Sequence, residues 1–330
     1  LVWNAANLPR ARLTFLAQGS AYVVRDDLET TLRDLVNAVV NRLDDQGVPD
    51  TPLAEDWAAV CGTVDEERAF CRAAALLGWD PYALGTRDAN AVIEVARQVP
   101  PSLLAEFLGV TDPAKLMQHA TLLGLLLQKA QHTTFRLTSL KRLRERPIPV
   151  RAQRTPWEQG YELARHFRER IGVNGAHVHT VEHLGEMMKL DPAIWRRATR
   201  PRPEGVDFVS GLVAVNQHGT PSFVVEDRNK PARTFAVCRA LCEYLAAPTE
   251  TAALVTTAYS ERQKRNRAFA AELVAPAELL RKRIRSSTLV PAETIQEIAT
   301  DLGTSEFVIR HQIENHPLAR VADAWDSASE

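Results

Sequence analysis

A pair of short apolar runs, set among segments patterned for helices, is the feature that most constrains the fold. Gly211-Leu-Val-Ala-Val215 and Ser222-Phe-Val-Val225 have the length and composition of strands. Asn216, Gly219 and Pro221 in the spacer between them are residue types that favour a hairpin loop. We therefore predict a mainly α chain whose C-terminal domain is α+β and contains a small β-hairpin or sheet.

Apolar residues at helical spacing dominate the first part of the chain. Glycine and proline end most of these runs, and no convincing two-residue alternation precedes residue 135. The expected helices cover 28–43, 66–77, 88–99, 102–108 and 114–130. We expect an all-helical N-terminal domain over 1–135.

A basic, proline-containing segment follows at 136–155, and we place the linker between two domains there. From Arg136 to Arg154 it holds seven bases and one acid, and Pro147-Ile-Pro149 cannot continue a helix. One interpretation is a solvated helix face that runs into a linker. The other is contact with nucleic acid or with an acidic partner, and the nucleic-acid candidates are Lys141, Arg142, Arg144 and Arg146.

Composition excludes several classes of protein. The net charge of -1 over 330 residues argues against a polyanion-binding surface over the whole chain. No apolar run approaches the roughly 20 residues that cross a bilayer, so we expect no membrane partner. Four cysteines in a chain of this length indicate reduced thiols and a cytoplasmic protein.

The stretch from about 155 to 318, half of the chain, resembles the ImmA/IrrE family of metallopeptidases. Five segments match in order, and the strongest is Asn266-Arg-Ala-Phe-Ala-Ala-Glu-Leu-Val-Ala-Pro276. The others are an opening helix at 163–172, the hairpin at 208–225, the lead into the zinc helix at 233–237 and a closing helix pair at 295–315. The resemblance implies a domain over 156–318 and a C-terminal tail over 319–330.

The family's zinc-binding residues are replaced in this chain. Family members carry a His-Glu-x-x-His helix, in which two histidines hold zinc and the glutamate acts as general base, and an acidic third ligand on the next helix. In the alignment Arg239 and Glu243 stand at the two histidine positions and Ala240 at the general-base position. Four residues before Phe269, the third ligand position holds Arg265. The resemblance therefore predicts a pseudoprotease without zinc or any other cofactor, in which no residue is catalytic.

The replaced site is expected to be a charged cluster, with a structural role if it is buried or a role in recognising a protein partner if it lines an open cleft. Arg239 and Glu243 lie four apart on one helix face, so an ion pair between them, or with Arg265, would stand where the metal was. We favour an open cleft with these three residues as partner-binding candidates. The residues expected in the core are Phe235, Val237, Leu241, Phe269 and Leu273.

Active relatives cut repressors and related regulators in prophage, mobile-element and stress-response systems. The resemblance thus implies a regulator or interaction protein in such a system or in a defence system.

Two other functions remain open. The first is an active peptidase with an atypical metal site built on Cys238, Cys242 and Glu243. The second is a DNA-binding regulator, because Glu297 to Ile313 has the pattern of a helix-turn-helix. Its base-reading face would be Ser305, Glu306, Arg310 and His311.

Three further groups have both an ordinary and a functional interpretation. Cys238 and Cys242 are either buried apolar side chains or, with Cys61 or Cys71, ligands of a soft metal. The histidines His177, His179 and His183 are either a loop and helix-start cluster or a metal site. Glu272 is either a surface or capping carboxylate or a catalytic group.

Overall fold

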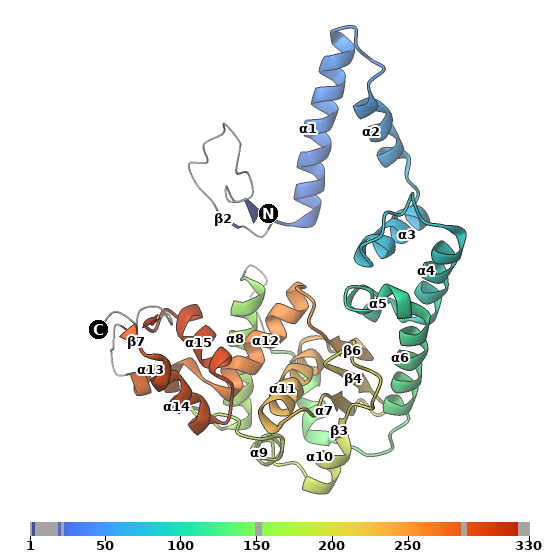
Figure 1. The fold of residues 1–330 in the computed structure, drawn as a ribbon. Helices are drawn as coiled ribbons and strands as arrows, with labels where there is room; N and C mark the ends of the chain where they lie inside the picture. Colours follow the sequence, from blue (N-terminus) through green and yellow to red (C-terminus); the bar gives the residue numbers. More distant parts are fainter. Residues whose placement is uncertain (1, 4–18, 21–22, 149–153, 285–288, 323–330) are drawn as a thin grey trace. The chain divides into compact units, whose positions relative to one another are not determined.

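The computed structural model describes residues 2–3, 19–20, 23–148, 154–284 and 289–322, which fold as two compact units (Figure 1). The first unit is Leu1–Ala69 and the second is Phe70–Glu330. Both are mainly helical, and the second contains a small sheet, which confirms the predicted fold class. No helix in the described ranges is both long and apolar enough to cross a membrane.

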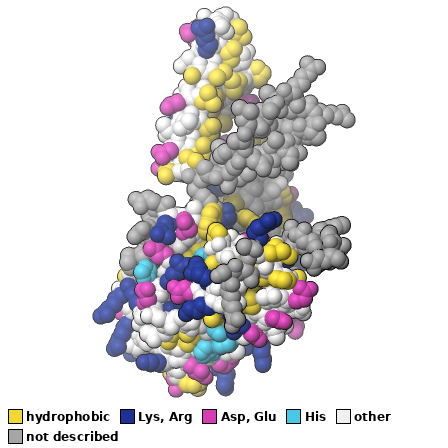
Figure 2. Space-filling model, turned by 90° about the vertical axis from the view of Figure 1, so that its left-hand side faces the viewer, with side chains coloured by type: hydrophobic (Ala, Val, Ile, Leu, Met, Phe, Trp, Pro, Cys, Tyr) yellow, Lys and Arg dark blue, Asp and Glu magenta, His cyan; other side chains and the backbone are white. Residues whose placement is uncertain are grey.

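The first unit is built from two helices and one pair of very short strands. β1 (Val2–Trp3) pairs antiparallel with β2 (Gly19–Ser20), so the expectation of a purely helical region was wrong at this point. α1 spans Arg25–Asp45 and α2 spans Pro52–Gly62, with the Thr51 side chain accepting a hydrogen bond from the Ala54 backbone N–H at the start of α2. Yellow hydrophobic side chains are visible on the surface of this unit, in the upper part of Figure 2.

The second unit begins within α3 (Asp65–Leu76) and contains the remaining helices. Those before the sheet are α4 (Thr86–Gln98), α5 (Pro101–Leu108), the 3-10 turn η2 (Pro113–Lys115), α6 (Leu116–Gln131), α7 (Thr138–Glu145), α8 (Pro156–Ile171), α9 (Val181–Met187) and α10 (Pro192–Ala198). Those after the hairpin are α11 (Lys230–Ala246), α12 (Glu261–Val274), α13 (Ala277–Ile284), α14 (Ala292–Leu302) and α15 (Glu306–Asn315).

A four-stranded sheet lies at the centre of this unit. Its strands are β3 (Thr199–Pro201), β4 (Gly211–Val215), β5 (Pro221–Val225) and β6 (Ala252–Val255), in the spatial order β3-β5-β4-β6. β4 and β5 form the predicted antiparallel hairpin, with Gly211 opposite Val225. β6 adds antiparallel to β4, and β3 adds parallel to β5.

Both faces of the sheet are buried, each by a different set of helices. On β5, Phe223 and Val225 pack into a core shared with α8, α11 and α12. Val224, together with Leu212 of β4 and Leu254 of β6, packs into a second core shared with α4, α5 and α6. Strands that are apolar at nearly every position are typical of a sheet covered on both faces.

The two covered faces correct the predicted domain boundaries. Helices α4 to α6, which we assigned to a separate N-terminal domain over 1–135, complete the core of the sheet. The division between the compact units therefore falls at 69/70 rather than in the segment 136–155.

The predicted linker is also part of this unit where the structure describes it; residues 149–153 of it lie outside the described ranges. α7 occupies its first half, and Leu140 is fully buried. The Asn216 side chain in the hairpin loop donates to the backbone oxygens of Thr133 (2.9 Å) and Phe135 (3.3 Å). The Leu137 N–H donates to the Thr220 hydroxyl. These bonds fasten the chain before α7 to the hairpin loop.

The closing helix pair forms as predicted, with one addition. Gly303 ends α14 in the left-handed conformation (φ 63°), and the Ser305 hydroxyl accepts from the Val308 N–H at the start of α15. Beyond α15, β8 (Arg320–Val321) pairs in parallel with β7 (Leu289–Val290). The folded region thus extends past residue 318, where we had expected the tail to begin.

Candidate functional site

The positions predicted to correspond to zinc ligands lie on α11 and α12, two helices whose starts are fixed by side-chain caps. Asn229 caps α11 by accepting from the Ala232 N–H, and Ser260 caps α12 by accepting from the Gln263 N–H. On the other side, α12 packs closely on α8 at Gly160. These contacts set the position of α12 beside α11.

Arg239 is buried between the two helices and makes three hydrogen bonds. Its Nε donates to Oδ1 of Asn266 (2.8 Å), and its Nη2 donates to Oε1 of Gln263 (2.8 Å) and to the backbone oxygen of Thr256 (2.6 Å). The residue is 6% exposed. Burial, with a smaller contribution from the Arg267 guanidinium, lowers the pKa of Arg239 to about 9, while Glu243 opposes the shift.

Glu243 is paired with a different arginine from the one expected. Its Oε2 lies 2.5 Å from Nε of Arg262, and its Oε1 accepts from Nδ2 of Asn266 at 2.8 Å. Arg262 also forms an ion pair with Glu250. Both oxygens of the Glu243 carboxylate are therefore occupied, and its side chain has no exposure.

This arrangement corrects two expectations about the site. Arg239 and Glu243 do not form an ion pair, because the amide of Asn266 lies between them and bonds to both. The cluster is buried rather than lining an open cleft. Arg265 does not join it, and its side chain instead interacts with Cys242. Ala240, at the predicted general-base position, is part of the core.

The cysteine alternative finds little support in the described residues. Burial raises the pKa of Cys238 to about 12 and, with Glu243 adding to the effect, raises that of Cys242 further, so both thiols stay protonated and unreactive. Cys71 lies 3.8 Å from the Tyr82 hydroxyl, and Cys61 is an exposed residue of the first unit. Nowhere in the described ranges do three or more His, Cys, Asp or Glu side chains gather as metal ligands would.

Glu272 is a buried structural carboxylate. Its Oε1 lies 3.1 Å from Arg168 and 3.2 Å from Arg165, both on α8. Its Oε2 accepts from the Ala277 N–H at the start of α13 and from the Gln312 amide on α15. The capping interpretation was right, but the residue joins four helices and does not lie on the surface.

The rings of the three histidines lie next to one another, but among the described residues they do not form a group that could hold a metal ion. The rings of His177 and His179 have centroids 3.9 Å apart, and those of His179 and His183 are 5.1 Å apart. Nε2 of His177 is buried and has no hydrogen-bond partner in the described structure. Burial, followed by repulsion from His179, His183 and Arg283, lowers the pKa of His177 to about 4.

Acid should therefore destabilise the protein through His177. Between pH 6.5 and 4 the unfolded chain takes up a proton at this side chain that the folded chain does not, so the free energy of unfolding falls as pH falls. We expect His177→Gln to reduce the drop in melting temperature over this range, measured by circular dichroism. The control is His132→Gln, at the exposed end of α6. Equal drops in both variants would contradict this role of His177.

The basic candidates for nucleic-acid binding do not form one surface. Arg144 is buried and donates to the backbone oxygens of Ala247 and Glu250 at the C-terminal end of α11, so it is a capping cation unavailable to phosphate. Lys141 pairs with Glu145 on the same helix, at 3.7 Å. Arg142 and Arg146 are exposed, and Arg310 lies on α15, a separate element.

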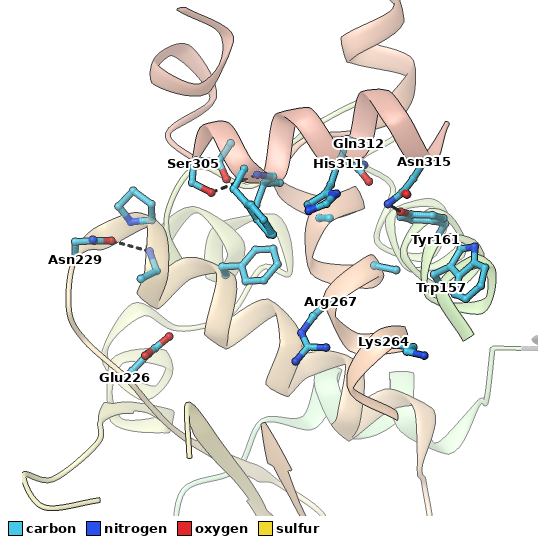
Figure 3. A pocket seen from close by; sticks show the side chains of 18 of the residues that line it. Trp157, Tyr161, Glu226, Asn229, Lys264, Arg267, Ser305, His311, Gln312 and Asn315 are labelled. Carbon is cyan, nitrogen blue, oxygen red and sulfur yellow. Dashed lines mark hydrogen bonds between the residues drawn. The ribbon is translucent and has the colours of Figure 1, made fainter. Parts of the chain in front are cut away.

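A pocket of about 960 Å³ was not foreseen from the sequence (Figure 3). Its walls come from the first turn of α8, the first turns of α11, one face of α12 and α15. Ser305 and His311, predicted to read DNA, line it. Arg267 connects the pocket to the buried cluster, because its guanidinium and that of Arg239 both donate to the backbone oxygen of Thr256.

Comparison with known protein families and curated proteins identified no relative. No family model matches the sequence, and no curated protein matches it. The similarity to ImmA/IrrE peptidases stays a prediction from the sequence.

Proposed function

We propose that the protein is a non-catalytic, metallopeptidase-like protein that binds a protein partner. The Arg239 guanidinium carries the proposal. It lies between α11 and α12, at the position that the resemblance gives to a zinc ligand, and three oxygen acceptors surround it. A buried cation repels a divalent metal ion, so an arginine at this position supports the proposal that the protein has lost its zinc.

The neighbouring side chains also fail to fit zinc. Zinc sites in proteins use histidine, cysteinate or carboxylate ligands. Here Glu243 offers the carboxylate, but Arg262 and Asn266 already occupy both its oxygens. Asn266 and Gln263 are neutral amides that are weak ligands for zinc. No reaction step through a metal is therefore assigned to this chain.

The partner is proposed by analogy with the peptidases that the chain resembles. Those enzymes act on repressors and related regulators in prophage, mobile-element and stress-response systems. A chain that kept the scaffold and lost the metal would bind such a regulator, or another subunit of a defence or mobile-element complex, without cutting it. This activity would take place in the cytoplasm.

Metal content tests the proposal. We expect the purified protein to hold far less than one zinc per chain by elemental analysis. The variant Arg239→His/Glu243→His/Asn266→Asp should bind about one, because three ligands then converge where Asn266 now bonds to both neighbours. Ala240 is left unchanged, since a glutamate there would place an unpaired charge in the core.

Two outcomes would overturn the proposal. About one zinc per wild-type chain, lost in Cys238→Ala or Cys242→Ala, would favour the atypical metallopeptidase. A triple variant that folds, as judged by circular dichroism, but takes up no zinc would show that Arg239 and Glu243 do not correspond to the family's two histidine positions. The wild-type measurement stands even if the triple variant fails to fold.

A further inference from the structure

The helix hairpin α1–α2 of the first unit has no core of its own. From Asp26 to Arg72, a range that the structure describes without a gap, no residue is buried. Units below about 40 residues usually need a disulfide, a metal or a second chain to fold stably. Cys61 on α2 forms no disulfide, and no group of metal ligands occurs among the described residues. We therefore expect the hairpin to associate with another chain.

The apolar side chains of α1 form one stripe, and α2 covers only one side of it. At 3.6 residues per turn they fall within an arc of about 140° around the helix. These residues are Leu28, Leu32, Leu35, Val36, Val39, Val40 and Leu43. On one side of the arc, Val36, Val40 and Leu43 are partly buried. α2 is held on that side, because the Trp57 indole N–H donates to Oδ1 of Asn37 at 2.7 Å.

The other side of the arc lies in water. Leu32, Leu35 and Val39, which we call the exposed stripe, are 49%, 59% and 42% exposed. Figure 2 shows hydrophobic side chains on the surface of this unit. The three residues are separated by three and then four positions, the spacing by which helices pack along one another. A contiguous apolar surface of this kind is typical of an association site.

The charges beside the exposed stripe fit a second copy of the same helix. Asp27 near the start of α1 and Arg42 near its end lie on the same flank, about 80° and 20° beyond Leu35. Neither forms an ion pair with a described residue. A twofold axis between antiparallel helices brings the same flank of both together, the start of one beside the end of the other. Each Arg42 then lies beside the partner's Asp27. A parallel pair would instead bring this flank against the one that α2 covers.

We propose that the protein dimerises through α1, which packs antiparallel against α1 of a second copy. Leu35 of the two chains would meet at the twofold axis, with Leu32 of each chain beside the partner's Val39. An ion pair between Arg42 and the partner's Asp27 would form at each end of the contact. The inference goes beyond the proposed function and does not depend on it, because the metal-ligand positions lie in the other unit.

Analytical ultracentrifugation of the full chain over a range of concentrations tests the inference. We expect the wild-type protein to form a species of twice the mass of one chain. Leu35→Ser should raise the dissociation constant of the dimer about fiftyfold, because each dimer loses two leucines from the contact. The matched control is Leu125→Ser on α6, a leucine of similar exposure (58%) in the other unit. It should leave the dissociation constant unchanged.

Charge reversal tests the antiparallel orientation. Arg42→Glu and Asp27→Lys should each weaken the dimer about tenfold, since each replaces two ion pairs by two contacts between like charges. The double variant Arg42→Glu/Asp27→Lys restores opposite charges across the contact, so its dissociation constant should return close to that of the wild-type protein. Leu35, Asp27 and Arg42 are all exposed, so these variants are expected to keep their helices, which circular dichroism checks.

Several results would contradict the inference. A dimer that Leu35→Ser weakens no more than Leu125→Ser does would place the contact elsewhere, and a double reversal that restores nothing would exclude the antiparallel pair. A wild-type chain that stays monomeric would exclude the dimer altogether. If such a monomer dimerised only in the variant Phe15→Ser, the exposed stripe would be assigned to residues 4–18 of the same chain. The zinc measurement is unaffected by any of these results, so the two proposals can fail separately.

Discussion

Replacing Arg239 by alanine is expected to lower the free energy of unfolding by about 3–5 kcal/mol. The substitution removes a buried cation and three hydrogen bonds, so the Asn266, Gln263 and Thr256 oxygens each lose one donor. It also opens a cavity in the contact between α11 and α12. Urea unfolding followed by circular dichroism measures the change.

The control removes an arginine that is paired on the surface. The side chain of Arg228 is 74% exposed and forms an ion pair with Glu226, and exposed pairs contribute about 1 kcal/mol or less. Arg239→Lys separates charge from geometry, since lysine keeps the cation but cannot present the planar fork that reaches three acceptors. A loss in Arg239→Ala no larger than that in Arg228→Ala would mean that the cluster is hydrated and contributes little to the fold.

Helix and hairpin positions were predictable because each depends on local pattern. The loop residues Asn216 and Gly219 form the hairpin turn that their types favour, since the Asn216 side chain accepts from two N–H groups of the loop and Gly219 has φ 74°. Val237, Leu241, Phe269 and Leu273 are fully buried as expected. Phe235 is only partly buried, because the helix turn that carries it also forms the pocket wall.

The domain boundary was wrong because a linker pattern says nothing about which sheet face a distant helix covers. The apolar pattern of the strands did indicate that helices cover both faces of the sheet. Ala252 and Leu254 on β6 face α4 to α6, while Ala253 and Val255 face α11. An apolar residue at every position requires cover on both sides, and the helices after the hairpin supply only one.

The partners of Arg239 were missed for a related reason. The motif alignment singled out Arg265 and passed over Gln263 and Asn266, whose side chains actually bond to Arg239. Their spacing contained the information, since polar residues three apart on a helix share a face with Ala270 and Leu273, which are buried. Amides on such a face need polar partners. The pocket could not be predicted in this way, because its walls come from four helices that are far apart in the sequence.

Adding one methyl group at Gly160 is expected to cost about 3 kcal/mol of stability. Gly160 lies on α8 where α12 passes closest, and an added Cβ would clash with the backbone oxygen of Arg265 and come within 2.9 Å of the Phe269 nitrogen. Backbone atoms cannot rotate away as a side chain can, so Gly160→Ala must separate the two helices. The separation would move Asn266 on α12 relative to α11.

The same substitution at Gly124 provides a control of opposite sign. Gly124 is an exposed residue of α6 with nothing within 4 Å of an added Cβ. Alanine there is expected to stabilise the protein by about 0.5–1 kcal/mol, since it restricts the unfolded chain and favours the helix. Urea unfolding of both variants gives the comparison. If Gly160→Ala were as stable as the wild-type protein, α8 and α12 could not pack as closely as described. The position of α12 beside Arg239 would then also be wrong.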